Sequence, residues 1–274
     1  MPVRSLGVAA FALMTALAPP AMAETELQAY LAARQTFESL MADAAKTGDA
    51  PRLADPRVRD TLAILSNASG TLGSASFPVD DEAVQRDLCS VPVRTAFDYL
   101  QFGLEAFTDE MINEKRLSPT SSRDAIGTVV DELGARNMVK FQDEVFPLLA
   151  FGQRCTAVEI RWLTTFFEKL PPEQMTEVRR QGLRGFRGSV KQMAIYALGL
   201  LANPVVHGDN RRLMLKSAAR NLPALSEALS LDQRAEVKRE VEKLGANAPE
   251  AYLPDIAAIL QALSNTQCEG LCRL

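Results

Sequence analysis

Residues 173–202, EQMTEVRRQGLRGFRGSVKQMAIYALGLLA, have the pattern of one long helix. In the first half, apolar and small residues recur three or four apart on one helical face. These residues are Val178, Gly182, Phe186, Ser189 and Met193. From Met193 to Leu201 the apolar residues run all round the helix, which is typical of a helix buried on every side. The stretch therefore predicts the central helix of an all-α domain.

Four cations on the same stretch form what we call the basic stripe: Arg180, Arg184, Arg187 and Lys191. At 100° per residue they lie within about 60° of one another. Like charges at this spacing repel by roughly a few tenths of a kcal/mol per adjacent pair, so compensating anions are expected. These anions are either acidic residues of neighbouring helices or an anionic partner, which guanidinium groups bind bidentately.

The rest of the chain also has helical character. Apolar residues recur at helical spacing, and Ser230 followed by Gln233 is a capping box, whereas alternating strand patterns are almost absent. The predicted fold class is all-α: a multi-helix bundle or an irregular αα-hairpin array of roughly ten helices. Helix breaks are expected at Pro92, at Pro147, and at Asn221 with Pro223.

The predicted organisation begins with an N-terminal helical hairpin at residues 24–66. Residues 67–80 are rich in Gly, Ser and Ala without a sustained apolar period, which predicts a linker or loop. Residues 81–274 then form the main helical domain with a cysteine-bearing C-terminal tail. Residues 170–181 and 229–240 are similar at an offset of 59, which fits either a repeated two-hairpin unit or the general similarity of helix starts.

Residues 1–23 have the pattern of a signal peptide that is removed on export. Arg4 precedes an uncharged apolar run from Leu6 to Ala18, and residues 21–23 (AMA) match an A-x-A cleavage site. The mature chain is expected to start at Glu24, in the periplasm or outside the cell, with no transmembrane segment. Removal of residues 1–23 changes the net charge from −4 to −5, because one Arg and no acid is lost. This acidic balance argues against nucleic-acid binding.

Four cysteines in an exported chain indicate disulfides. Cys268 and Cys272 enclose three residues and are followed by Arg273, so neither a haem-attachment C-x-x-C-H nor a redox C-x-x-C is present. We favour the pairs Cys89–Cys155 and Cys268–Cys272. The alternative is that each of the two tail cysteines pairs separately with Cys89 or Cys155, which would hold the tail against the core.

Few residues point to catalysis. His207 is the only histidine, and no G-x-S-x-G or S-x-x-K motif accompanies it, so a surface position is favoured over a catalytic one. No metal site or cofactor is predicted, because the histidine and cysteines lack ligand spacing. Trp162 with Phe166 and Phe167 is expected to be core. Three glycines inside the helical stretch, Gly182, Gly185 and Gly188, favour a close helix crossing or a local break.

The sequence favours an exported, periplasmic α-helical binding or accessory protein of the cell envelope. Its expected partner is another envelope protein or an anionic envelope component. One alternative is a cell-envelope hydrolase with a buried carboxylate or serine; another is a structural subunit of an envelope complex. A buried titratable group in an apolar cleft would favour the enzyme, whereas a broad exposed apolar or charged groove would favour binding.

Overall fold

A computed structural model of the chain describes residues 20–67, 82–118, 120–268 and 270–273. Every regular element in these ranges is a helix and none is a strand, which confirms the all-α fold. The α-helices are α1 (Pro20–Thr47), α2 (Pro56–Asn67), α3 (Glu82–Leu100), α4 (Leu104–Asn113), α5 (Arg123–Lys140), α6 (Gln142–Lys169), α7 (Glu177–Ala202), α8 (Gly208–Ala228), α9 (Leu231–Gly245) and α10 (Leu253–Leu263). Short 3₁₀ helices are η2 (Pro172–Gln174), η3 (Glu250–Tyr252) and η4 (Gly270–Arg273).

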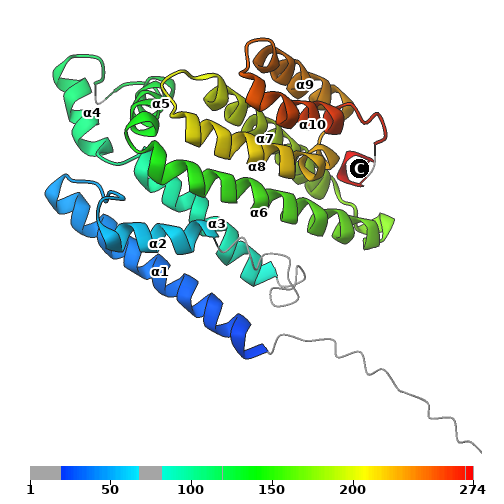
Figure 1. Cartoon of the computed structure of the whole chain (residues 1–274), viewed down its shortest axis with the longest axis horizontal. Helices are drawn as coiled ribbons and strands as arrows, with labels where there is room; N and C mark the ends of the chain where they lie inside the picture. The colour runs from blue at the N-terminus through cyan, green and yellow to red at the C-terminus, as the bar shows by residue number, and fades with distance from the viewer. Residues whose placement is uncertain (1–19, 68–81, 119, 269, 274) are drawn as a thin grey trace, which may run out of the picture.

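The central helix is α6, not the predicted stretch 173–202. Figure 1 shows α6 running through the middle of the molecule, with α1 and α2 on one side and α8 to α10 on the other. It packs against α8, α3, α2, α5 and η4. Val145, Phe146, Leu148 and Ile160 of α6 are completely buried, so this helix supplies side chains to the core on several of its faces.

Helix α7, which contains the basic stripe, packs at one side against α8 and α9. Its buried face is centred on Leu183, Val190, Ala194, Ala197 and Leu201, and Leu198 and Leu200 at its edges are buried as well. This face is rotated by about 90° from the predicted one, and Val178 of the predicted face is 79% exposed. The apolar run from Met193 to Leu201 misled the prediction, because Tyr196 in the middle of that run lies at the surface.

The three prolines expected to interrupt helices lie inside them. Pro92 lies within α3, Pro147 within α6 and Pro223 within α8, and each helix continues past its proline. A proline removes one hydrogen bond, and packing of the rest of the helix outweighs that loss here. The capping box of α9 is present, since Ser230 and Gln233 exchange side-chain to backbone hydrogen bonds.

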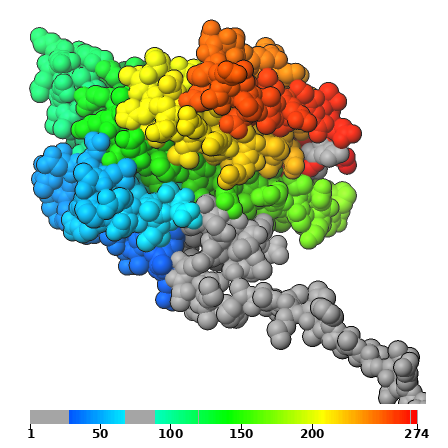
Figure 2. Space-filling view, viewed as in Figure 1, coloured from blue at the N-terminus to red at the C-terminus, as the bar shows by residue number. Residues whose placement is uncertain are grey.

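The N-terminal helices α1 and α2 pack on each other and share one hydrophobic core with the rest of the protein. Tyr99 of α3 joins the two parts: its ring contacts Phe37 of α1 and Phe141 beside α6, and its hydroxyl donates to the Pro51 carbonyl. Figure 2 shows the hairpin (blue) against the middle of the chain (green), with the C-terminal helices (orange and red) on the opposite side.

Two predicted segments fall largely outside the described residues. Of the predicted signal peptide, residues 1–19 lie outside, and residues 20–23 belong to the first turn of α1. Of the predicted linker at 67–80, only Asn67 is described, as the last residue of α2.

Candidate functional site

The candidate site is a surface groove between α3 and α6. The sulfurs of Cys89 on α3 and Cys155 on α6 lie 2.26 Å apart, at disulfide distance, with the Cα atoms 5.4 Å apart. Gly152 lies one turn before Cys155, and a Cβ atom there would approach the Val93 side chain to 3.3 Å. The lack of a side chain at Gly152 therefore lets the two helices come close beside the disulfide.

The groove encloses about 600 Å³, a volume in the range of pockets that bind small ligands or a few side chains. Its walls are two helix faces, each aligned by the disulfide. The lining residues are Cys89, Ser90, Val93, Arg94 and Phe97 from α3, and Gly152, Cys155, Thr156, Glu159 and Trp162 from α6. Most of this lining is apolar, and the ring of Phe97 is 52% exposed. An exposed apolar surface of this kind is typical of a binding site.

Aromatic residues continue the groove along α6, contrary to the prediction that they belong to the core. Trp162 is half-buried and stacks on Phe166, with ring centroids 5.6 Å apart and planes at 16°. Phe166 is 39% exposed, while Phe167 is half-buried and packs against the main core. The cluster thus extends from core to surface, because α6 buries only part of its circumference at its C-terminal end.

One carboxylate, Glu159, lies among the described residues that line the groove. Among the described residues no hydrogen bond or ion pair reaches Glu159, and burial among neighbouring atoms raises the pKa of its carboxyl. Arg94 on the facing wall interacts instead with Asp98 one turn further along α3; burial raises the pKa of Asp98 and the Arg94 charge partly offsets this. The Glu159 side chain is itself exposed to solvent, so neighbouring atoms remove only part of its hydration.

The sequence analysis missed this site, although one signal was available. Ser90, Val93 and Phe97 follow Cys89 at helical spacing, and Glu159 and Trp162 follow Cys155 in the same way. Once those two cysteines are paired, the two faces must lie beside each other.

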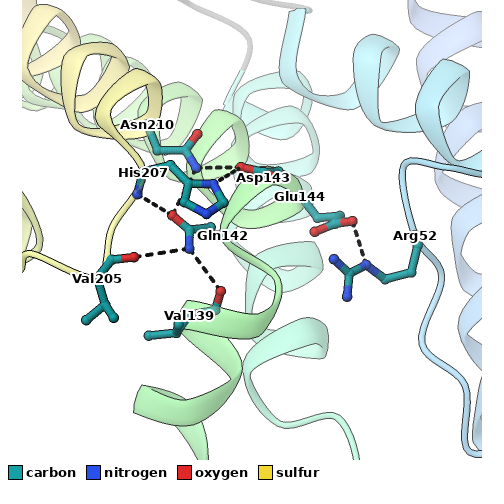
Figure 3. Close-up of polar contacts among 8 residues, drawn as sticks. All are labelled: Arg52, Val139, Gln142, Asp143, Glu144, Val205, His207 and Asn210. Atoms are coloured by element: carbon teal, nitrogen blue, oxygen red, sulfur yellow. Dashed lines mark hydrogen bonds and ion pairs between the residues drawn. The ribbon is translucent and has the colours of Figure 1, made fainter.

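His207, the only histidine, belongs to a polar junction between the starts of α6 and α8 (Figure 3). Its Nδ1 lies 3.1 Å from Asp143 Oδ1, which also accepts a 2.7 Å hydrogen bond from Asn210. The Gln142 side chain accepts from the His207 backbone N–H and donates to the Val205 carbonyl. The His207 side chain is largely exposed, as expected, and these contacts hold the α7–α8 loop against α6.

Glu144, on the other side of the same helix start, is the most buried carboxylate among the described residues. Its Oε1 accepts from Arg52 Nε at 2.9 Å and from the Leu53 backbone N–H at 3.1 Å. Figure 3 shows this pair tying the α1–α2 loop to α6. A buried carboxylate with these partners joins structural elements, and it does not line the α3–α6 groove.

The first two cations of the basic stripe interact with their own helix. Arg180 Nε and Arg184 Nη2 lie 3.3 and 2.6 Å from the two oxygens of Glu177, in the first turn of α7. Both arginines hold the pKa of the Glu177 carboxyl below its usual range. All three side chains are exposed, so solvent weakens these ion pairs.

The other two cations reach neighbouring elements. Lys191 pairs with Glu236 of α9 at 2.8 Å, and Arg187 donates to the backbone carbonyl of Leu271 in η4. Both contacts are possible because the stripe lies beside the buried face of α7 rather than opposite to it. Each cation of the stripe therefore has a hydrogen-bond or ion-pair acceptor within the protein. An anionic partner is not needed to compensate these charges.

The C-terminal tail is held by backbone acceptors. Cys268 and Cys272 pair at 2.05 Å, so both pairs match the favoured connectivity. The buried guanidinium of Arg234 donates to the carbonyls of Ser226, Asn265 and Gln267, which joins α8 and α9 to the tail.

The three glycines of α7 have no close neighbour. A Cβ atom at Gly182, Gly185 or Gly188 would meet nothing within 4 Å, so these glycines do not mark a close helix crossing. The helix also continues through them without a break.

In the described ranges, no helix is long and apolar enough to span a membrane, and no group of three or more His, Cys, Asp and Glu is arranged to hold a metal ion. The fold and the groove define this chain as an all-α protein with a disulfide-linked surface groove. Comparison with protein-family models, curated proteins and solved structures finds no match to this chain.

Proposed function

We propose that this protein is exported to the periplasm and works by binding, with the α3–α6 groove as its docking site. The observation that carries the proposal is the groove itself: an apolar cavity of about 600 Å³ with exposed aromatic walls. A partly exposed aromatic surface is unfavourable in water and is typical of a site that another molecule covers. Export is supported by the signal-peptide pattern of residues 1–23 and by the pairing of all four cysteines.

Site-specific photo-crosslinking in intact cells tests the docking site. A photoreactive residue in place of Phe97, inside the groove, should give one discrete adduct with an envelope component. The same residue in place of Val178, exposed on α7 and outside the groove lining, is the control and should give none. Equal labelling from both positions, or no adduct from position 97, would contradict docking in the groove.

The export part of the proposal has its own test. The intact mass of the protein from the envelope fraction should correspond to a chain that starts at Glu24 and has no free thiol. A chain that retains Met1, or one found with reduced cysteines in the cytoplasm, would contradict export.

A cell-envelope hydrolase is a second candidate, because Glu159 has a raised pKa in an open groove, as a general acid requires. Binding is favoured since Glu159 is the one carboxylate among the described residues that line the groove, and glycoside hydrolysis generally uses two. Turnover of purified envelope polymers that Glu159→Gln abolishes would favour the enzyme. A structural subunit of an envelope complex would use the same groove as its contact with another subunit.

A further inference from the structure

We propose that the outer faces of α6 and α8 bind a membrane surface of anionic phospholipids through a group of five cations. This group, called the α6–α8 cation cluster, consists of Arg154 and Arg161 of α6 and Arg212, Lys216 and Arg220 of α8. The proposal goes beyond the proposed function, because it assigns a second ligand to a surface other than the α3–α6 groove. It is supported by the position of the cations, by their lack of internal ion pairs and by the extent of the surface.

Helices α6 and α8 lie side by side and run in the same direction (Figure 1). At their starts, Asn210 of α8 donates a hydrogen bond to Asp143 of α6. Two turns further along both helices, Ser217 Oγ of α8 donates to the Ala150 carbonyl of α6 at 3.1 Å. The next turn of each helix carries one arginine of the cluster, so this packing brings the two arginines to the same level of the helix pair.

The five cations form one positive surface. On α6, Arg161 lies two turns beyond Arg154, and on α8 the three cations recur at steps of four. Arg154 is half-buried, and the side chains of Arg161, Arg212, Lys216 and Arg220 are exposed. Burial lowers the pKa of Arg154, and the nearby charges of Arg220 and Arg161 lower it further. The cations of the two helices therefore act on one another.

The protein itself does little to compensate this cluster. Within the described ranges, no ion pair reaches Arg161 or the three cations of α8. Acidic residues on the same helix faces come before and after the cations: Asp143 and Glu168 on α6, and Asp209 and Glu227 on α8. The basic stripe of α7 differs, because each of its cations has an internal acceptor. The cluster is therefore a positive surface that an external anion can neutralise, in a chain whose net charge is −4.

The extent of the cluster favours a membrane over a small anion. The cations span about 12 Å of α8 and about 10 Å of α6. A single phosphate or carboxylate is bound at one point, whereas anionic headgroups attract every Lys and Arg near the membrane surface. Leu213 of α8 is 38% exposed on the same face as Arg220, and its apolar side chain suits the boundary between headgroups and acyl chains. The proposed export would place the protein beside a membrane.

Membrane binding would leave the α3–α6 groove accessible. Glu159 of the groove lining and Arg154 of the cluster are five residues apart, which places them about 140° apart around α6. The two surfaces therefore face in different directions, and occupation of one does not block the other.

Sedimentation with lipid vesicles tests the proposal on the purified full chain. One vesicle is made of phosphatidylcholine alone, and the other of equal parts of phosphatidylcholine and phosphatidylglycerol. The protein should bind the anionic vesicle at low salt and leave the neutral vesicle unbound. Added salt should weaken the binding, because it screens exposed charges. Equal binding to both vesicles, or binding to neither, would overturn the proposal.

Lys216→Gln with Arg220→Gln should weaken binding to the anionic vesicle by about thirtyfold, since each cation near such a surface contributes roughly fivefold. The matched control is Arg123→Gln with Arg239→Gln, which removes the same charge at exposed residues of α5 and α9 and should have little effect. Circular dichroism should show the same helix content in all variants. Equal weakening by both pairs would show that binding follows net charge alone and would overturn the role of the cluster.

Two further outcomes separate the alternatives. If soluble polyphosphate binds through Lys216 and Arg220 while anionic vesicles do not bind, the ligand is a polymer and the membrane is wrong. The vesicle assay uses purified protein, so its result does not depend on export or on the groove. A chain that retains Met1, or a groove without a crosslink at position 97, would contradict the proposed function and leave vesicle binding unchanged.

Discussion

The two disulfide pairs close loops of very different length, which predicts how much each stabilises the fold. Cys89 and Cys155 are 66 residues apart in sequence, and Cys268 and Cys272 only four. In the chain-entropy model a crosslink restricts the unfolded chain more when the loop is longer. For these two loops, the model gives a stabilisation of about 4 and about 2 kcal/mol at 25 °C.

We therefore expect Cys89→Ala with Cys155→Ala to lower the free energy of unfolding by about 4 kcal/mol. Cys268→Ala with Cys272→Ala is the matched control and should lower it by about 2 kcal/mol. Denaturant titration measures both values, and in a domain of this size each kcal/mol corresponds to a Tm lower by roughly 2–4 °C. The first variant should also show a larger m value, since its unfolded chain exposes more surface.

Reduction of the unmodified protein with a thiol reagent provides an independent comparison. Its stability should fall by about the sum of the two losses, because the pairs lie in separate parts of the fold. Equal losses in the two double variants would show that loop length does not control the effect. No loss in the first variant would show that Cys89 and Cys155 are not crosslinked in solution.

Three further predictions concern single side chains. Arg234→Met should lower the free energy of unfolding by about 3 kcal/mol, measured by denaturant titration, since it leaves three backbone carbonyls without their buried donor. Arg239→Met, at an exposed site, is the control and should have little effect. Burial raises the folded-state pKa of Glu159 above its ordinary value of 4.5, so the folded state binds the proton more tightly than the unfolded state does. The free energy of unfolding therefore falls as the pH rises from about 4.5 to the raised pKa. Glu159→Gln should flatten this part of a Tm-against-pH profile, and an unchanged profile would contradict the desolvation argument. Arg187→Gln should lower the free energy of unfolding by about 1–2 kcal/mol, because the hydrogen bond to the Leu271 carbonyl in the tail is lost. Arg184→Gln breaks only an exposed ion pair and should leave Tm nearly unchanged. A larger loss from Arg184→Gln than from Arg187→Gln would contradict these contacts.

The fold class and the capping box of α9 followed from the sequence because both depend on local patterns. Helical periodicity and the exchange of hydrogen bonds between Ser230 and Gln233 need no knowledge of the rest of the chain. The position of each helix in the molecule depends on its neighbours instead. The residues of α7 were therefore predicted to form the central helix, whereas α6, a stretch of similar apolar content, is the central helix of the structure.

The orientation of α7 shows the same limit in more detail. Small residues such as Gly182 and Ser189 were counted with the apolar face, although they can lie on any face of a helix. The burial of Leu183 and Val190 defines the true face, and that face places Lys191 beside α9. Which residues pair with the basic stripe could not be predicted, because that depends on how α7 is rotated about its own axis.

The groove was not predicted because its aromatic residues are of a kind that is ordinarily buried. Phe97 and Trp162 have the helical spacing of core residues, and periodicity cannot distinguish a face covered by the same chain from one left open. The raised pKa of Glu159 likewise depends on the surrounding atoms, which the sequence alone does not provide.

The position of η4 determines when the fold can be completed. Leu271 of η4 is completely buried, and η4 packs against α6 and α8, which precede it by many residues. Contacts between such distant parts of a chain can form only after the whole intervening segment is present. A chain that emerges N-terminus first from a ribosome or a translocation pore therefore has its core open at α6 and α8 until η4 has come through.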